Sequence, residues 1–361
     1  MSNDVLSVVI AGGGTAGHIE PALAVGEQLS THHDARITAL GTPKGLEKEI
    51  IPARGVDLRM IIPVPIPRKP SMDLVKLPYR IIRAVSQTRK VLKDVDADAV
   101  FGTGGYVAAP AYLAAKSLRL PFYVLETNAL AGIANKLGVK LGGVGFNATA
   151  SSGMAGEVVG IPVRSELGKD PDGEAAQRGY DTWGLNNSKP VLLVTGGSQG
   201  AASINAAVAD ALPELLQHVQ VLHAYGRKNE APQARDGYVP VPYIDDMAAA
   251  IAVADLTVCR SGAMTVAEIT AAGLPAIYVP LPHGNGEQAL NSKHVVDAGG
   301  AVMIKDSDLN GAALAKAVEE IATDDAKRQD MITAAKGSGA GDVARSLAAR
   351  IANDVKAKES K

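Results

Sequence analysis

The sequence predicts an α/β protein of two domains, each with a parallel sheet covered by helices and facing a central cleft. Its 361 residues are enough for two separate hydrophobic cores. Strand-like apolar runs alternate with amphipathic helical stretches along the whole chain, as in parallel α/β folds. Two glycine-rich turns, at residues 12–17 and 196–200, each follow a buried-strand pattern and precede a helical stretch. This repeated unit predicts a cleft that holds a nucleotide-bearing substrate.

The individual elements follow from the spacing of apolar residues. In the first half, strands are expected at residues 5–10, 36–40, 99–101 and 122–125, and a helix at 81–92. In the second half, strands are expected at residues 191–194, 219–223, 256–259 and 276–279. A helix at 265–272 should end at Gly273, because Pro275 follows shortly after it.

The domain boundary is expected where the composition changes. Residues 160–189 are rich in Gly, Pro, Asp and Ser, and we place the junction at Pro162. This gives a first domain at 1–162 and a second domain at 163–340. Near the C-terminus, Val343, Leu347, Ile351 and Val355 recur every four residues. The segment 341–361 is therefore expected to be a helix that packs back on the first domain.

Composition excludes several classes of protein. The net charge of -2 and the pI near 6.4 disfavour a nucleic-acid binder. The single cysteine, Cys259, rules out an intrachain disulfide and a multi-cysteine metal site, and its strand-like surroundings predict a core residue. No secretory signal is expected, and no apolar run approaches the roughly 18–20 residues of a membrane span. We therefore expect a soluble cytoplasmic protein that could still lie on a membrane surface.

The two glycine turns are candidate anion sites, because small residues let backbone N–H groups approach a ligand at the start of a helix. Gly12, Gly14 and Gly17 match the dinucleotide fingerprint. The acidic residue that should end the second strand is missing, since Asp34 precedes that strand and Glu47 lies on the next segment. Neither turn ends in the Gly-Lys-Ser/Thr sequence that a P-loop requires. A dehydrogenase and an NTPase are both disfavoured.

His18 follows the first glycine turn and is a candidate general base. It is expected at the start of a helix with Pro21 in the first turn. The helix dipole should lower the pKa of the imidazole and keep it neutral, ready to accept a proton. A surface or capping histidine is the alternative interpretation.

Two polar clusters in the second half suggest contacts to a nucleotide sugar, and a third is expected to cap a helix. Glu268 could accept hydrogen bonds from two ribose hydroxyls, or could form a capping box with Thr265. The segment 281–288 suits hydrogen bonding to sugar hydroxyls, or is a plain surface loop. Asp245 or Asp246 is expected to cap the next helix, and no metal site is predicted.

A proline-dense apolar loop at residues 61–70 ends in Arg68 and Lys69. Further cations follow on or near the next helix: Arg80, Arg83, Arg89 and Lys90. An apolar loop with a basic flank suits docking on an anionic membrane. An ordinary connecting loop fits the pattern equally well.

Seven motifs in this order resemble the MurG family, the membrane-associated N-acetylglucosaminyltransferases of peptidoglycan synthesis. They lie at residues 13–18, 104–107, 126–128, 160–164, 196–201, 244–247 and 260–268. The resemblance runs from the first strand to about Gly300. Two positions depart from the usual family pattern, namely Ala16 in the first loop and Thr127 in the third motif.

The resemblance implies a GT-B fold of two Rossmann-like domains and an inverting transfer that needs no metal or cofactor. The donor would be UDP-N-acetylglucosamine, and the acceptor would be the C4 hydroxyl of undecaprenyl-diphospho-N-acetylmuramoyl-pentapeptide. The enzyme would be peripheral on the cytoplasmic face of the cell membrane and could contact cell wall and division proteins. A UDP-N-acetylglucosamine 2-epimerase and a non-catalytic UDP-sugar-binding scaffold are the alternatives.

The resemblance also implies roles for residues at the matching positions. Arg164 and the backbone of Ile244 would hold uracil, and Glu268 the ribose. Ser198 would hold the diphosphate together with the helix start at Ala263, Met264 and Thr265, and Val266 and Ala267 would belong to the same donor site. Asn128 and either Glu287 or Gln288 would contact the sugar. The sugar and acceptor side would be lined by Thr15, Ala16, Gly17 and His18, with Glu126 as the reserve base. Tyr106, Ile66, Arg68 and Lys69 would face the acceptor and the membrane.

Overall fold

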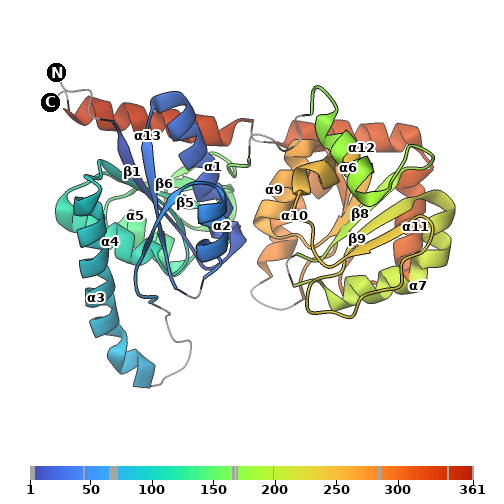
Figure 1. The fold of residues 1–361 in the computed structure, drawn as a ribbon, viewed down its shortest axis with the longest axis horizontal. Helices are drawn as coiled ribbons and strands as arrows, with labels where there is room; N and C mark the ends of the chain where they lie inside the picture. Colours follow the sequence, from blue (N-terminus) through green and yellow to red (C-terminus); the bar gives the residue numbers. More distant parts are fainter. Residues whose placement is uncertain are drawn as a thin grey trace. The chain divides into compact units, whose positions relative to one another are not determined.

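The chain forms two compact units, each built around its own parallel sheet (Figure 1). The structure is a computed structural model that describes residues 5–43, 45–64, 72–164, 167, 170–197, 199–282, 286–339 and 341–359. Unit 1 comprises Met1–Arg164 and Asp342–Lys361, and unit 2 comprises Ser165–Gly341. The predicted class, α/β with two parallel-sheet units, is confirmed.

The sheet of unit 1 has the strand order β3-β2-β1-β4-β5-β6-β7, and its neighbouring strands pair in parallel. The strands are β1 (Ser7–Gly12), β2 (Arg36–Gly41), β3 (Asp57–Met60), β4 (Ala99–Gly104), β5 (Phe122–Glu126), β6 (Val144–Asn147) and β7 (Glu157–Val158). The order reverses between β1 and β4. In a parallel sheet, such a reversal opens a crevice at the carboxyl ends of the two strands. The first glycine turn follows β1 at this point.

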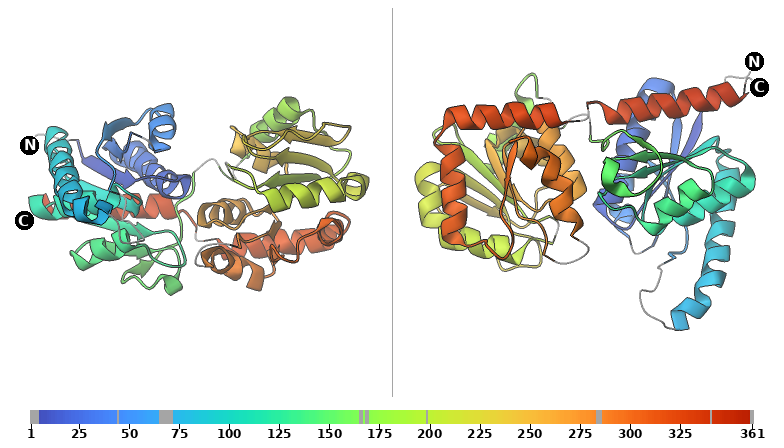
Figure 2. Two further views of the ribbon diagram at one scale, coloured as in Figure 1. Left: turned by 90° about the horizontal axis from the view of Figure 1, so that it is seen from below. Right: turned by 180° about the vertical axis from the view of Figure 1, so that it is seen from behind.

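Helices cover both faces of this sheet (Figure 2). They are α1 (Ala16–His33), α2 (Glu47–Ala53), α3 (Met72–Asp94), α4 (Ala108–Leu118), α5 (Ile133–Lys140), the short 3-10 helix η1 (Ala150–Ser152) and α13 (Val343–Glu359). Alternate residues of β1 enter different cores, because successive side chains of a strand point to opposite faces. Val8 and Ile10 pack with α1 and α13, whereas Val9 and Ala11 pack with α4. This is why the strand reads as a continuous apolar run.

The last helix, α13, packs against α1 in unit 1. Its four apolar residues at four-residue spacing, Val343, Leu347, Ile351 and Val355, are all buried in the core that contains β1 and α1. The chain therefore leaves unit 1 near Arg164 and returns to it at Asp342.

Unit 2 repeats the plan with six parallel strands in the order β10-β9-β8-β11-β12-β13. The strands are β8 (Val191–Thr195), β9 (Gln220–Ala224), β10 (Tyr238–Val241), β11 (Leu256–Cys259), β12 (Ala276–Tyr278) and β13 (Ala301–Met303). The helices are α6 (Glu174–Trp183), α7 (Ala202–His218), α8 (Met247–Val253), α9 (Ala263–Ala272), α10 (Glu287–Asp297), α11 (Gly311–Ala322) and α12 (Asp325–Ser338). Here the strand order reverses between β8 and β11, and the second glycine turn follows β8.

Local signals in the sequence are mostly confirmed. Asp246 caps α8 by accepting a hydrogen bond from the N–H of Ala249 at 3.0 Å. Gly273 ends α9 with a φ of 69°. Cys259 is buried, and burial raises the pKa of its thiol to about 12. In the described part of the chain, no helix combines the length and apolar character needed to span a bilayer.

Two expectations about helix starts are wrong. Helix α1 begins at Ala16, so Pro21 lies in its second turn and not in its first. Helix α9 begins at Ala263 with Gly262 as its N-cap, so Thr265 is not the cap of a capping box. In both cases small residues before the predicted start are already helical, which an apolar pattern does not reveal.

A buried histidine connects β9 to the start of α7. His223 Nε2 lies 3.0 Å from Asn205 Oδ1, and His223 Nδ1 lies 2.9 Å from the hydroxyl of Tyr238. Asn205 donates its amide N–H to the carbonyl of Tyr225, so its Oδ1 is free to accept from His223. The neutral imidazole is therefore fully hydrogen-bonded, and burial lowers its pKa to about 4.

We expect acid to destabilise the protein through His223. Its pKa is about 4 in the folded protein and 6.5 in the unfolded chain. Between these values the unfolded chain binds a proton that the folded state excludes, so the free energy of unfolding falls as the pH decreases from 6.5 to 4, by about 2–3 kcal/mol. Urea denaturation at pH 7, 6 and 5 measures this slope. The slope should flatten in His223→Gln and stay unchanged in the exposed control His32→Gln; equal slopes in both variants would contradict the assignment.

The buried face of α13 should contribute strongly to stability. Leu347→Ala leaves a cavity in the core of unit 1 and should lower the free energy of unfolding by about 2–5 kcal/mol. The matched control on the same helix is the exposed Asn353, whose change to Ala should cost less than about 0.5 kcal/mol. Urea denaturation followed by circular dichroism compares the two. Equal losses would show that the helix does not stabilise unit 1 through this face.

Candidate functional site

A pocket of about 450 Å³ lies in unit 2 where β8 and β11 end. The second glycine turn forms part of its wall through Gly196, Gly197 and Gly200. Gly197 has a φ of 81°, and its N–H donates to Thr195 Oγ1 at 3.2 Å. Such a turn keeps side chains away and brings backbone close to a ligand. Residue 198 lies outside the described residues, so the predicted role of Ser198 is not examined by the structure.

Two helices begin at this pocket. Ala201, the N-cap of α7, and Gly262, the N-cap of α9, both line it, and neither helix has a side-chain cap. Amide groups in the first turn of a helix have no partner within the helix and carry the positive end of its dipole. Two such ends at one pocket suit an anion such as a diphosphate.

Arg260 also lines the pocket, and the sequence patterns did not single it out. Its guanidinium donates to the carbonyls of Val279 and Pro280, and to Asp306 Oδ1 at 2.6 Å. It also donates to Ser203 Oγ at 2.9 Å, and Ser203 lies in the first turn of α7. Arg260 thus joins the end of β12 to the start of α7. Asp306 lies 46 residues after Arg260 in the sequence, so local sequence patterns could not predict this network.

The predicted donor contacts at residues 263–268 divide into pocket-facing and core residues. Thr265 lines the pocket, while Val266 packs in the core and Met264 is buried. Ala263, Ala267 and Glu268 are half-buried. Because α9 begins at Ala263, Glu268 lies in its second turn. A role in capping the helix therefore does not account for a glutamate at this position.

The choice between Glu287 and Gln288 can be weighed by position. Gln288 lines the pocket and its side-chain oxygen accepts from the N–H of Leu281 at 3.0 Å. Glu287 is the first residue of α10 and does not line the pocket. Ile244 is buried beyond the end of β10. Next to it, the ring of Tyr243 is partly exposed, with the Arg227 guanidinium 4.4 Å from its centroid.

In unit 1, the first glycine turn packs directly on the turn after β4. The N–H of Gly13 donates to the carbonyl of Gly104 at 3.3 Å. A Cβ on Gly105 would lie 1.9 Å from the carbonyl oxygen of Gly13, so only glycine fits there. Gly14 has a φ of 87°, whereas Ala16 is the first residue of α1 and has a negative φ. The departure at Ala16 therefore causes no backbone strain.

His18 lies three residues into α1, and its main chain is fixed to β4. Its carbonyl oxygen accepts from Thr103 Oγ1 at 2.6 Å. A Cβ on Gly104 would lie 3.0 Å from both Nδ1 and Cε1 of the imidazole, so the ring rests against the backbone of Gly104. Thr15 and Ala16 are exposed, and Gly17 and His18 are half-buried. The half-exposed ring of Tyr106 lies beside Gly14.

Glu126 is buried and its carboxylate accepts four hydrogen bonds. Oε1 accepts from the main-chain and side-chain N–H groups of Asn128, at 2.9 and 3.2 Å. Oε2 accepts from the N–H of Gly132 and from Asn135 Nδ2, both at 2.9 Å. Glu126 thus shapes the loop between β5 and α5, which carries the half-buried Asn128. Asn135, which the sequence analysis missed, receives a further hydrogen bond from Tyr112.

Arg164, at the end of the first part of unit 1, is next to an acid on α1. Its Nε lies 4.0 Å from Glu20 Oε2, and Arg54 lies 3.5 Å from the same oxygen. Glu20 is two residues beyond His18.

Helix α3 exposes apolar side chains among cations. Tyr79 and Ile82 are 66% and 69% exposed, which is unusual for residues of this size in a folded domain. Arg80 and Arg83 adjoin them in the sequence. Ile66, Arg68 and Lys69 of the preceding loop lie outside the described residues.

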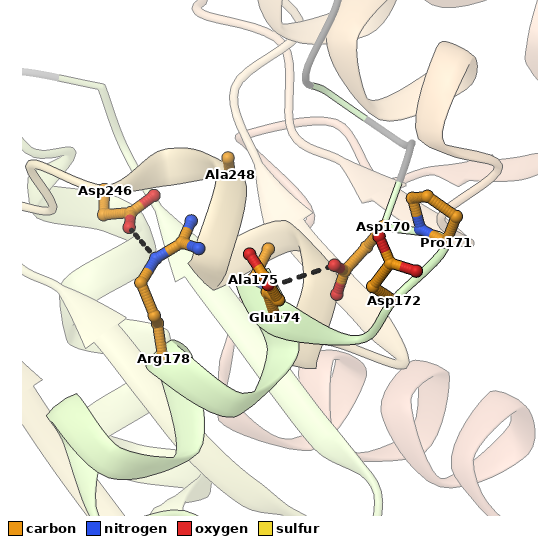
Figure 3. Close-up of a pocket in the computed structure, with 8 residues that line it drawn as sticks. All are labelled: Asp170, Pro171, Asp172, Glu174, Ala175, Arg178, Asp246 and Ala248. Carbon is orange, nitrogen blue, oxygen red and sulfur yellow. Dashed lines mark hydrogen bonds and ion pairs between the residues drawn. The ribbon is translucent and has the colours of Figure 1, made fainter.

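A second hollow in unit 2, between α6 and α8, has no comparable chemistry (Figure 3). Figure 3 shows Arg178 directed at Asp246, with an ion pair of 3.2 Å. Asp170 caps α6 by accepting from the N–H groups of Ala175 and Ala176, which lowers the pKa of its carboxyl. Its charged groups thus serve the structure of α6 and α8. The glycine-turn pocket remains the better candidate.

Comparison with known proteins agrees with this geometry. The glycosyltransferase family 28 N-terminal domain matches residues 8–141, and the glycosyltransferase family 28 C-terminal domain matches residues 191–347. A protein of Corynebacterium efficiens, named UDP-N-acetylglucosamine–N-acetylmuramyl-(pentapeptide) pyrophosphoryl-undecaprenol N-acetylglucosamine transferase, is 60% identical over 348 residues, covering 96% of this chain and 97% of the relative. A relative of the same name from Mycolicibacterium smegmatis is 51% identical over 357 residues, covering 95% of this chain and 92% of its own length.

Solved structures agree as well. The crystal structure of Acinetobacter baumannii MurG has a TM-score of 0.73 and 28% identity, and the match covers 96% of this chain and 99% of that one. The two units therefore have the GT-B glycosyltransferase fold. With near full-length relatives of one name and both family domains in order, the chain belongs to the MurG family of N-acetylglucosamine transferases within glycosyltransferase family 28.

Proposed function

We propose that this chain transfers N-acetylglucosamine from UDP-N-acetylglucosamine to the C4 hydroxyl of undecaprenyl-diphospho-N-acetylmuramoyl-pentapeptide. The observation that carries the proposal is the unit 2 pocket, where two uncapped helix starts meet a glycine turn. This arrangement suits the diphosphate of a nucleotide sugar. The names of the relatives supply the substrate class.

The donor is assigned mainly to unit 2. The diphosphate would contact Ser198 and the start of α9 at Ala263, Met264 and Thr265, with Thr265 facing the pocket. Glu268 would bind the ribose, and Ile244 with Arg164 would hold uracil. Gln288 is preferred to Glu287 as the sugar contact, because it lines the pocket. On unit 1, the sugar and acceptor would contact Asn128, Tyr106 and residues 15–18.

Inversion at the anomeric carbon follows if the acceptor hydroxyl attacks as UDP leaves. The hydroxyl loses its proton to the base, the new bond forms at C1, and the electron pair of the old bond goes to UDP. Negative charge then grows on the leaving diphosphate, where the helix amides at the pocket can stabilise it. These amides lie at the positive ends of two helix dipoles, so the proposed step includes no metal.

His18 is the proposed general base in preference to Glu126. The carboxylate of Glu126 already accepts four hydrogen bonds from its own loop. Taking a proton would weaken several of them at once, because a protonated oxygen accepts less strongly. His18 lies in the first turn of α1, beside the first glycine turn, and its side chain is half-buried.

The exposed apolar residues of α3 suit peripheral docking on the cytoplasmic face of the membrane, where the lipid-linked acceptor resides. Tyr79 and Ile82 would enter the interface, while Arg80 and Arg83 meet anionic headgroups. Cell wall and division proteins are further candidate partners.

The deciding experiment measures UDP release from UDP-N-acetylglucosamine with and without a short-chain analogue of the lipid acceptor. We expect release only with acceptor present. Formation of UDP-N-acetylmannosamine from donor alone would instead indicate a 2-epimerase. Donor binding without UDP release would indicate a scaffold.

His18→Ala should lower kcat by about 10²- to 10⁴-fold, the usual contribution of a general base. Affinity for UDP, measured by calorimetry, should change little because the residue lies in unit 1 and the pocket in unit 2. His32→Ala, at the exposed far end of the same helix, is the control. Near-normal turnover in His18→Ala would exclude this residue as the base.

Ile82→Glu should weaken binding to vesicles of anionic phospholipid by about tenfold, because an apolar side chain no longer enters the interface. Turnover of a water-soluble acceptor analogue should be unchanged. Val302→Glu changes a partly exposed apolar residue in unit 2 and serves as control. Equal vesicle binding by both variants, in a sedimentation assay, would argue against docking through α3.

A further inference from the structure

Glu47 is a completely buried carboxylate next to the first glycine turn. It is the first residue of α2, in the connection that follows β2. Its side chain reaches the turn after β1, where Oε1 accepts a hydrogen bond from the N–H of Gly14 at 3.0 Å. Thirty-three residues separate the two partners, so this bond joins two loops at the carboxyl ends of neighbouring strands.

Glycine backbone surrounds this carboxylate closely. A Cβ on Gly13 would lie 2.4 Å from Oε1, and a Cβ on Gly45 would lie 1.6 Å from Oε2. On the other side, a Cβ on Gly41 would lie 3.0 Å from the Cβ of Glu47. A side chain at Gly13 or Gly45 would meet the carboxylate itself and could be placed only by moving Glu47 from its present position. The two loops are therefore built around Glu47.

Burying a carboxylate is costly unless hydrogen bonds compensate for the lost water. The bond to Gly14 is one such compensation, and it also determines where the turn's N–H points. Gly14 has a φ of 87°, a conformation from which the chain enters α1 through Thr15. A shift of this turn would move the first turn of α1, which carries His18.

The regions of the two glycine turns thus differ in which groups accept hydrogen bonds from their backbone N–H groups. In unit 2 the uncapped helix starts face an open pocket. In unit 1 the N–H of Gly14 is already taken by the protein's own carboxylate. That amide is occupied and cannot serve a phosphate without displacing Glu47.

We propose that Glu47 is a positioning residue for the transfer reaction: its buried side chain accepts a hydrogen bond from Gly14 and so holds the first glycine turn with His18 facing the acceptor hydroxyl. This inference rests on the proposed function, since it assumes that His18 is the base. Glu47 touches no substrate and acts only through residues 13–18. General-base catalysis is sensitive to small displacements of the base, so a loosened turn lowers kcat before it affects donor binding.

The test compares Glu47→Gln, Glu47→Asp and Glu47→Ala in the full-length protein. Glutamine keeps an oxygen that can accept from the N–H of Gly14. Aspartate is one methylene shorter, so its carboxylate no longer reaches that N–H, and alanine has no acceptor. Glu49→Gln, two residues further on α2 and exposed, is the matched control. The measurements are kcat, the KM for donor, the Kd for UDP by calorimetry, and amide hydrogen exchange of residues 12–18 and 196–200.

We expect kcat to fall about 10- to 100-fold in Glu47→Ala and Glu47→Asp, the usual effect of losing a hydrogen bond to a charged group. Glu47→Gln should stay within about fivefold of wild type, and Glu49→Gln should match it. The Kd for UDP should change by less than about twofold. Hydrogen exchange should rise at residues 12–18 but not at 196–200.

Normal kcat in a folded Glu47→Ala protein would overturn the proposal, and so would equal losses of kcat and UDP affinity. If Glu47→Ala does not fold, the kcat values of Glu47→Gln and Glu47→Asp decide the question. A kcat of Glu47→Asp equal to or higher than that of Glu47→Gln would overturn the proposal. Hydrogen exchange separates this inference from the proposed function. If the wild type transfers no sugar, the proposed function is refuted. If hydrogen exchange in Glu47→Ala still rises only at residues 12–18, Glu47 is retained as the residue that holds the turn in place.

Discussion

The structure depends on how it satisfies backbone N–H groups where a buried parallel strand ends and a helix begins. At this point the strand's hydrogen bonds stop, and the first amides of the helix have no partner within it. Glycine permits the sharp turn, but it provides no side chain to accept from those amides. Something else must do so: a neighbouring loop, a buried side chain or a ligand. Both units meet this constraint at the reversal of strand order, between β1 and β4 and between β8 and β11.

The two units meet it differently, and the difference matches the roles proposed for them. In unit 1, Glu47 accepts from Gly14, the carbonyl of Gly104 accepts from Gly13, and Glu126 holds the neighbouring loop. These bonds fix the turn that precedes α1, as expected of a surface that must hold a base in a fixed direction, although the start of α1 at Thr15 also has no side-chain cap. In unit 2, the helix starts at Ala201 and Gly262 have no side-chain caps and face a pocket. Under the proposed function, the diphosphate of the donor would complete that side.

Much of the fold could be predicted because its signals are local. Buried parallel strands read as continuous apolar runs, and the four-residue spacing from Val343 to Val355 marks the buried face of α13. The residues that brace the site could not be predicted in this way. Glu47 and Gly14 are 33 residues apart, and Arg260 and Asp306 are 46 apart. In the sequence, Glu47 is notable only because it lies beyond the strand end where a dinucleotide-binding site would have its ribose-binding acid. No local pattern indicates that its carboxylate points toward the first glycine turn. Thr265 failed as a cap for a related reason: the small residues before it were already helical.

Arg260 shows how such bracing bears on turnover. Its guanidinium lies at the pocket but is paired with Asp306 at 2.6 Å, and both side chains are largely buried. The pair is neutral overall, so attraction for a diphosphate comes chiefly from helix amides and dipoles, which is weaker than attraction by an unpaired cation. An unpaired arginine would hold UDP more tightly, as product as well as leaving group. Under the proposed function the enzyme must release UDP after every transfer, and stabilisation that product and transition state share equally does not raise kcat. The pairing of Arg260 with Asp306 therefore suits a site that must bind a diphosphate and also let it go.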